Sequence, residues 1–328
     1  MNTLYFICPD DNRPAGGIKV LYRHVDILNR NGYQAAIVHK KKEFRSTWFE
    51  NQTRVELHSR IQPDRFDFVV IPEVFGPRLA DVFPGTKKII FNRNAYDTFI
   101  GYSLDPRDLT TAYHHPDLVR VLVVSEGSRR YLTRVFPDLN VQRIHGSVDA
   151  SLFPFRELTD KKPLISFWGR EHREDAVQVV SILKFRGVLD ELDAVSIEDV
   201  SEREVAAVLE RSLIFLSFGF RDDFPSRSLE AMLSGCLVVG YHGMGGRECF
   251  NPEWSWPIEA GDIINFATAT EEIINTFHKS PHLLQEKARK ARDFVTREYS
   301  RDREERDVLA FWDDLMFEHG RDAIAEAP

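Results

Sequence analysis

One stretch in the second half of the chain limits the possible folds more than any other segment. An apolar run, Leu213–Phe218, predicts a strand, and a helix is expected to open near Ser226. A second apolar strand, Cys236–Tyr241, follows that helix directly, and a glycine-rich loop comes after it. Two buried strands joined by a single helix are typical of a parallel sheet, because parallel neighbours need a crossover connection. The stretch therefore predicts an α/β protein.

Carboxylates flank the start of this predicted helix. Asp222 and Asp223 precede it, and Glu230 lies within it. Loops at the carboxyl ends of parallel strands border the ligand crevice, and a helix amino terminus offers unpaired N–H groups to anions. A ligand with phosphates in its middle and hydroxyls at both ends suits this pattern. A nucleotide sugar is such a ligand.

Strand and helix patterns alternate along the rest of the chain in the same way. The expected strands are Leu4–Cys8, Ala35–His39, Phe66–Pro72, Lys87–Asn92, Arg120–Ser125, Val141–Gly146, Leu164–Arg170 and Asp193–Ile197. The expected helices are Ile18–Asn31, Ser125 to about Phe136, one ending near Gly187, Ser201–Ser212, and the charged region beyond Asn265. A polar segment with prolines follows Gly146 and is typical of a linker between domains. We therefore expect an N-terminal Rossmann-like domain over residues 1–148, a C-terminal one over 149–300, and a last helix over 301–328 that crosses back to the first domain.

Composition and charge narrow the function classes. The 328 residues carry 43 basic and 51 acidic side chains, a net charge of −8, which argues against a general nucleic-acid binder. Cys8, Cys236 and Cys249 form neither a disulfide framework nor a metal-ligand spacing. No apolar run approaches the length of a membrane-spanning helix, and the first residues resemble a strand rather than a signal peptide. We therefore expect a cytoplasmic protein.

A basic run, Lys40–Lys42, follows the second expected strand. A solvated loop explains such a run without any ligand. The alternative is contact with an acidic acceptor or with an anionic membrane surface, which would make the protein peripherally membrane-associated.

The chain resembles the retaining GT-B-fold glycosyltransferases of family 4, and the resemblance is stronger in the second half. These enzymes carry two glutamates separated by seven residues and followed by Ala-Met, a pattern similar to Asp222 to Met232 here. Gly16-Gly17 after the first strand, Gly169-Arg170, and the linker beginning at Val148-Asp149 also resemble the family. The resemblance implies two Rossmann-like domains whose parallel sheets face each other across a cleft. It also implies sugar transfer, with retention, from a nucleotide diphosphate sugar to an acceptor hydroxyl, as in cell-surface polysaccharide or glycoconjugate synthesis.

The resemblance also implies roles for individual residues. Glu230 would bind the donor's ribose hydroxyls and Asp222, or alternatively Asp223, the hydroxyls of its sugar. Arg170, with Arg173 in place of the family's lysine, would neutralise the diphosphate. The implied donor-binding set is Gly16, Gly17, Arg170, Arg173, Asp222, Phe224, Ser226 and Glu230. Phe224 and Ser226 would offer backbone N–H groups, which Pro225 lacks, and Ser226 could also cap the helix. Three of these residues also have explanations that need no ligand. Glu230 could be an acid in the first turn of its helix, where it complements the helix dipole, and Arg170 and Arg173 could be solvated side chains.

The catalytic group of the first domain is harder to assign. The family commonly has a histidine after the strand at Lys87–Asn92, where this chain has Arg93-Asn94. We take Arg170, Arg173, Asp222 and Asn94 as candidate catalytic residues, with Arg93 as an alternative to Asn94. His114 and His115 lie further along, in a segment more typical of the surface. No Asp-x-Asp motif stands with other metal ligands, so we expect metal-independent chemistry and no cofactor besides the donor substrate.

Other functions remain to be separated from this one. A catalytically inactive nucleotide-sugar-binding or scaffold protein of the same fold would keep the donor residues and lack the first-domain histidine. An epimerase or a glycogen-type phosphorylase would need acid–base groups or a pyridoxal lysine, and neither pattern is found. A dehydrogenase is disfavoured because the first turn has no Gly-x-Gly-x-x-Gly. The sequence leaves the base, the sugar and the acceptor open, whether carbohydrate, lipid-linked or another hydroxyl compound.

Overall fold

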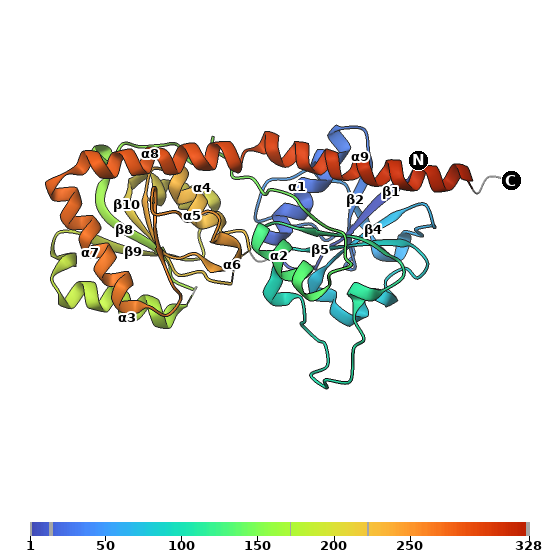
Figure 1. Ribbon diagram of the computed structural model, residues 1–328. Coiled ribbons are helices and arrows are strands. Elements are labelled where there is room, and N and C mark those ends of the chain that lie inside the picture. The colour runs from blue at the N-terminus through green and yellow to red at the C-terminus, as the bar shows by residue number, and fades with distance from the viewer. Residues whose placement is uncertain (1, 13–15, 171, 222, 326–328) are drawn as a thin grey trace. The chain divides into compact units, whose positions relative to one another are not determined.

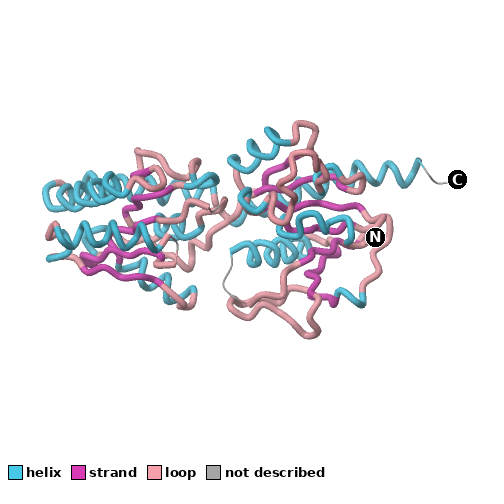
Figure 2. The backbone as a smooth tube through the Cα atoms, turned by 90° about the horizontal axis from the view of Figure 1, so that it is seen from below, coloured by secondary structure: helices cyan, strands magenta, loops and turns pink. Residues whose placement is uncertain are grey.

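The computed structural model describes residues 2–12, 16–170, 172–221 and 223–325 (Figure 1). The chain divides into two compact units, Met1–Gly146 with Asp302–Pro328, and Ser147–Arg301. Each unit contains one parallel sheet flanked by helices (Figure 2). The expected α/β class with two parallel sheets is confirmed.

The first unit contains a seven-stranded sheet in the order β3-β2-β1-β4-β5-β6-β7. Its strands are β1 Thr3–Ile7, β2 Gln34–His39, β3 Val55–Leu57, β4 Phe68–Pro72, β5 Lys87–Asn92, β6 Leu118–Val123 and β7 Val141–Arg143. From β1 the chain adds strands on one side as far as β3, then returns to add β4 on the other side of β1. The strand order therefore reverses between β1 and β4. In open α/β sheets the ligand crevice lies at such a switch point, outside the carboxyl ends of the strands.

Two helices cover one face of this sheet, although they lie at opposite ends of the sequence (Figure 1). These are α1 (Gly16–Arg30) and α9 (Arg301–Ala325). Trp312 of α9 is fully buried, with its ring centre 6.0 Å from that of Phe6 and 5.9 Å from that of Phe68. Successive side chains of a strand point to opposite faces, so Ile7 and Val69 instead pack with α2 (Glu126–Val135). The helix α9 therefore contributes to the core of the first unit.

The second unit contains a five-stranded sheet in the order β12-β11-β10-β8-β9. Its strands are β8 Lys162–Trp168, β9 Asp193–Ile197, β10 Ser212–Ser217, β11 Leu237–Tyr241 and β12 Trp256–Ile258. The strand β9 pairs on one side of β8, and β10 to β12 follow on the other side. The switch point of this sheet therefore lies between β8 and β10.

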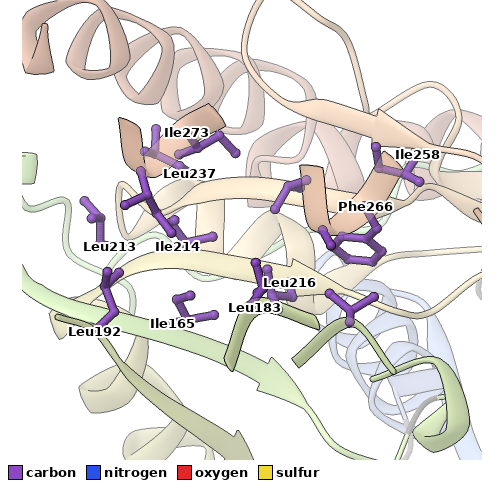
Figure 3. Close-up of a cluster of buried hydrophobic side chains, with 14 of the residues drawn as sticks. Ile165, Leu183, Leu192, Leu213, Ile214, Leu216, Leu237, Ile258, Phe266 and Ile273 are labelled. Carbon is purple, nitrogen blue, oxygen red and sulfur yellow. The ribbon is translucent and has the colours of Figure 1, made fainter. Parts of the chain in front are cut away.

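Helices cover both faces of the second sheet. They are α3 Arg173–Phe185, α4 Glu202–Arg211, α5 Ser226–Leu233, α6 Gly243–Gly246, α7 Ile263–Lys279 and α8 Pro281–Glu298. On one face, Ile165 and Leu216 of the sheet pack with Leu183 of α3 and Phe266 of α7 (Figure 3). On the other face, α4 and α5 pack with the alternate side chains of the same strands. This alternation with period two is the pattern that buries a parallel sheet on both faces.

The differences from the expected elements are local. The strands β3 and β12, each of three residues, were not expected, because segments this short show no periodicity. The glycine-rich loop expected after Tyr241 begins instead as the short helix α6. All three cysteines are buried thiols. Among the helices of the described residues, none combines the length and apolar character required to span a bilayer.

Candidate active site

The switch point of the second sheet brings two of the predicted site segments together. The strand β8 ends at Trp168, followed by Gly169-Arg170, and β10 ends at Ser217, followed by the segment that leads into α5. Because β8 and β10 are parallel neighbours, both segments emerge at the same edge of the sheet. The guanidinium carbon of Arg227, in α5, lies 4.3 Å from the centre of the Trp168 ring. This contact joins the two sides of the switch point.

Glu230 is buried in α5, with 5% of its surface exposed. Its Oε2 accepts a hydrogen bond from Arg227 Nη1 at 2.8 Å. The first turn of α5 contains no acidic residue, so the simpler explanation of Glu230 as a first-turn acid is wrong. A buried carboxylate is costly without a charged partner, and Arg227 supplies one. Sequence reasoning assigned Arg227 no role, because its contact with Trp168 joins two different elements and is visible only in the fold.

Serine hydroxyls fasten α5 to the sheet. Ser217 Oγ donates to the carbonyl oxygen of Tyr241 at 3.0 Å, and Ser228 Oγ donates to Ser217 Oγ at 3.1 Å. Ser217 and Tyr241 are the last residues of the neighbouring strands β10 and β11. These bonds fix the start of α5 relative to the carboxyl edge of the sheet, and with it the position of Glu230.

The turn before α5 uses its own hydrogen-bonding groups. Pro225 has φ −78° and ψ 62°, the conformation at the centre of an inverse γ-turn. The N–H of Ser226 accordingly donates to the carbonyl oxygen of Phe224 at 2.8 Å. Pro225 is therefore the N-cap, and the expectation that Ser226 caps the helix is wrong by one residue. The Ser226 amide, expected to face a donor, is engaged within this turn.

The segment before this turn is packed against α6. Asp222 lies outside the described residues. Asp223 is only 2% exposed, so it is not a solvated loop charge. A Cβ on Gly245 would collide with the backbone of Asp223, and one on Gly243 would stand 2.6 Å from the carbonyl oxygen of Phe220. The glycines of α6 therefore allow its backbone to lie directly against this segment.

The two arginines expected at the diphosphate lie in and after the turn that follows β8. Arg170 forms an ion pair with Asp199, and both side chains are exposed, at 61% and 68%. Arg173 is the first residue of α3 and is also exposed. Exposed ion pairs contribute little to stability, so an anion could compete with Asp199 for Arg170. A phosphate role for both residues remains a prediction.

The first unit presents a buried ion pair at its own switch point. Glu73 follows β4 directly and Arg93 follows β5 directly. Arg93 Nε lies 3.3 Å from Glu73 Oε2, with side-chain exposures of 11% and 2%. Burial raises the pKa of the Glu73 carboxyl, and the nearby Arg93 opposes that rise. Sequence reasoning missed Glu73. The only sign of it in the sequence is an acidic residue directly after a buried strand, and this position points to a site only once the strand order is known.

Gly16 and Gly17 begin α1, on the other side of this switch point. A Cβ on Gly17 would stand 2.7 Å from Arg93 Nη1, so the guanidinium lies against the glycine backbone. Asn94, the candidate catalytic residue beside Arg93, caps a short 3₁₀ helix (Ala95–Asp97), and its Oδ1 accepts from the Tyr96 N–H at 3.1 Å. Asn94 therefore has a structural role, and Arg93, paired with Glu73, is the cationic candidate of the two.

The remaining predicted features fall elsewhere. Lys40–Lys42 follow β2 as an exposed segment, and the backbone N–H groups of Lys40 and Lys41 donate to the Asp10 carboxylate. His114 ends a short 3₁₀ helix and contacts the ring of Phe136 at 5.3 Å. Across the residues that the structure describes, no group of three or more His, Cys, Asp or Glu side chains is placed to hold a metal ion.

Comparison with known proteins points to one enzyme class. Residues 155–310 match a family described as glycosyl transferase-like. A curated relative, an alpha-1,6-glucosyltransferase of Actinobacillus pleuropneumoniae serotype 7 (strain AP76), is 26% identical over 243 residues, which are 71% of each chain.

Two solved structures share the fold at low sequence identity. The sucrose-phosphate synthase of Thermosynechococcus elongatus has a TM-score of 0.72 and 11% identity, covering 97% of this chain and all of its own. Anabaena HepE, solved in complex with UDP-glucose, has a TM-score of 0.68 and 11% identity, covering 95% of this chain and 99% of its own. The parallel sheets, the match over the second unit and the curated relative agree, and the chain is a glycosyltransferase with the GT-B fold.

Proposed function

We propose that this enzyme transfers a glycosyl unit from a nucleotide diphosphate sugar to an acceptor hydroxyl and that its second unit binds the donor. The observation that carries the proposal is the buried Glu230 near the switch point, paired with Arg227, whose guanidinium lies over the Trp168 ring. An ionised carboxylate accepts two hydrogen bonds from a vicinal diol, as in ribose. The similarity to a glucosyltransferase and to a structure that holds UDP-glucose makes UDP-glucose the first donor to test.

The second unit also has cationic side chains that could neutralise the negative charge on the leaving diphosphate. When the bond between sugar and phosphate breaks, negative charge accumulates on the diphosphate, and fixed cations stabilise that transition state. Arg170 and Arg173 emerge after β8, beside the switch point, and a guanidinium can bind phosphate oxygens through two N–H groups. We therefore propose metal-independent transfer. Asp222 and the backbone N–H of Phe224 complete the proposed donor site.

Retention at the anomeric carbon, and a role in cell-surface polysaccharide or glycoconjugate synthesis, follow from the resemblance to family 4. The acceptor would present its hydroxyl to the first unit, where Arg93, Asn94 and the start of α1 at Gly16-Gly17 lie at the carboxyl edge of the sheet. Of these, Arg93 has the charge needed to act on a developing anion.

A specific observation favours a second candidate function, a nucleotide-sugar-binding protein without transfer activity. Asn94 is engaged as a helix cap, and Arg93 is paired with Glu73. A first unit whose polar groups are all held by internal partners would leave the donor bound and unreacted. Turnover measurements separate the two functions.

The test combines binding and turnover. Binding of UDP, GDP, ADP and UDP-glucose is measured by thermal shift and calorimetry for the unaltered chain, Glu230→Ala, and the control Glu272→Ala, whose side chain is exposed on α7. A ligand at about 100 times its Kd should stabilise the protein by about 2.7 kcal/mol. We expect Glu230→Ala to weaken binding and Glu272→Ala to leave it unchanged.

Release of nucleoside diphosphate from UDP-glucose is then followed over a panel of acceptors, with and without EDTA. Turnover that persists in EDTA supports metal-independent transfer. Binding without turnover for every acceptor would favour the second candidate. No shift with any nucleotide would remove the donor site from the second unit.

A further inference from the structure

Arg227 occupies a position between the two sides of the switch point. Its Nη1 donates to Glu230 Oε2 at 2.8 Å, and its guanidinium carbon lies 4.3 Å from the centre of the Trp168 ring. Trp168 ends β8, whereas Arg227 and Glu230 belong to the helix that follows β10. The three side chains thus connect the two strand ends at which a donor is proposed to bind.

Helix stability does not explain an arginine at this position. Arg227 is in the first turn of α5, where the positive end of the helix dipole disfavours a cation. The pair with Glu230 has the arginine nearer the amino terminus, the less favourable orientation for an ion pair along a helix. The same pair in reverse order, Glu126 and Arg129 in α2, follows the favourable rule. Arg227 is therefore placed to contact Glu230 and Trp168 and not to stabilise the helix.

Its partners hold the guanidinium on two sides. The side chain of Glu230 is 7% exposed and that of Arg227 is 27% exposed, so water screens this pair less than a surface pair. Trp168 is half-buried and packs against the core between the sheet and α5. A planar guanidinium can stack on an aromatic face while donating in its plane, which an ammonium group cannot do.

We propose that Arg227 is a positioning residue for the nucleotide. With Trp168 as a platform, it fixes the orientation of the Glu230 carboxylate that receives the ribose hydroxyls, and so sets the preference for ribonucleotides over deoxyribonucleotides. This inference rests on the proposed function. It adds to it the residue that determines sugar specificity within the nucleotide.

The proposal predicts a change in discrimination and not a uniform loss of binding. A hydrogen bond to a charged group discriminates by about tenfold or more, and the 2′-deoxy form of a nucleotide lacks one hydroxyl. When Arg227→Gln releases the carboxylate, the ribonucleotide loses the hydrogen bonds of both hydroxyls, whereas the deoxyribonucleotide loses only that of its 3′-hydroxyl, so the ratio of the two Kd values falls. Arg227→Lys keeps the charge without the planar stacking and should give an intermediate ratio.

The experiment measures Kd by calorimetry for UDP with dUDP, GDP with dGDP, and ADP with dADP, using the full chain. The variants are Arg227→Gln, Arg227→Lys and Trp168→Leu, with Arg129→Gln as the control because its pair also spans three positions along a helix. We expect the ratio of the two Kd values to fall about tenfold in Arg227→Gln and Trp168→Leu, less in Arg227→Lys, and not in Arg129→Gln.

If Arg227→Gln weakens binding of the ribonucleotide and the deoxyribonucleotide equally, so that the ratio of their Kd values is retained, Arg227 is a phosphate ligand. That result would overturn this inference and leave the proposed function standing. An unchanged Kd for both in Arg227→Lys and Arg227→Gln would also overturn it. If the unaltered chain binds none of the six nucleotides, the proposed function fails, and this inference fails with it. Thermal melts of each variant show whether a loss of binding reflects a loss of folding.

Discussion

At the scale of single residues, His24 shows how burial sets protonation in this protein. The imidazole is 1% exposed, and its Nε2 accepts a hydrogen bond from Trp312 Nε1 at 2.7 Å. Burial lowers the pKa of His24 from 6.5 to about 3, because a charged ring would lose its hydration without gaining a partner. The ring is therefore neutral in the folded protein over the usual pH range.

A pH dependence of stability follows from this shift. Below pH 6.5 the unfolded chain binds a proton at His24 and the folded chain does not, so acid favours unfolding. The free energy of unfolding should fall by up to about 1.4 kcal/mol per pH unit below that point. His24→Gln removes this contribution, and urea unfolding of the first unit between pH 7 and 5 should show a shallower dependence. The exposed His282 provides the control as His282→Gln; equal slopes for the two variants would contradict the prediction.

Individual site residues were predictable only where the sequence places them beside one another. The spacing of carboxylates and the residues Leu229 to Met232 pointed to Glu230, which the structure places in a buried position at the switch point. The role of its partner Arg227 becomes visible only when the contact with Trp168 of β8 is known. The pair of Glu73 and Arg93 likewise depends on β4 and β5 being neighbours. Sequence reasoning finds motifs whose residues stand together in the chain, whereas contacts between elements require the strand order.

At the scale of elements, the packing of α6 against the segment before α5 can be tested by adding a single methyl group. A Cβ on Gly245 would collide with backbone atoms of Asp223, which cannot rotate away. Overpacking of this kind costs about 1–3 kcal/mol. For a unit of this size each kcal/mol lowers the melting temperature by about 2–4 °C. We expect Gly245→Ala to lower the melting temperature of the second unit by several degrees.

The neighbouring glycine gives a matched control for this prediction. A Cβ on Gly246 would lie 3.3 Å from Pro225 Cγ, a contact that a small shift relieves. Gly246→Ala should therefore change the melting temperature by much less. Equal effects of the two substitutions would mean that the helix α6 is not held against Asp223.

Elements were predictable in proportion to their length. Strands of five to seven residues such as β8, β10 and β11 are rich in apolar residues and could be recognised directly. The three-residue strands β3 and β12 exist because β2 and β11 offer them unpaired edges, which no local pattern reveals. The helix α6 has the composition of a loop, and its conformation is set by the backbone it packs against.

At the scale of the whole molecule, the chain passes between the two units twice, after Gly146 and after Arg301. The second passage sends α9 into the first unit, where Val308, Phe311, Trp312 and Leu315 are almost completely buried. The core of the first unit therefore forms only when the last part of the chain is present, whereas the second unit is continuous in sequence.

This connectivity predicts that damage to α9 affects the two units differently. Trp312→Ala removes a fully buried side chain and should destabilise the first unit by about 3–5 kcal/mol. Phe317→Ala on the same helix changes a side chain that is 60% exposed and should have little effect. Urea unfolding followed by circular dichroism should then show an early transition only in Trp312→Ala. UDP binding should survive that early transition, because Arg170, Arg173 and Glu230, the proposed contacts to the diphosphate and the ribose, belong to the second unit; loss of binding together with the first unit would contradict that assignment.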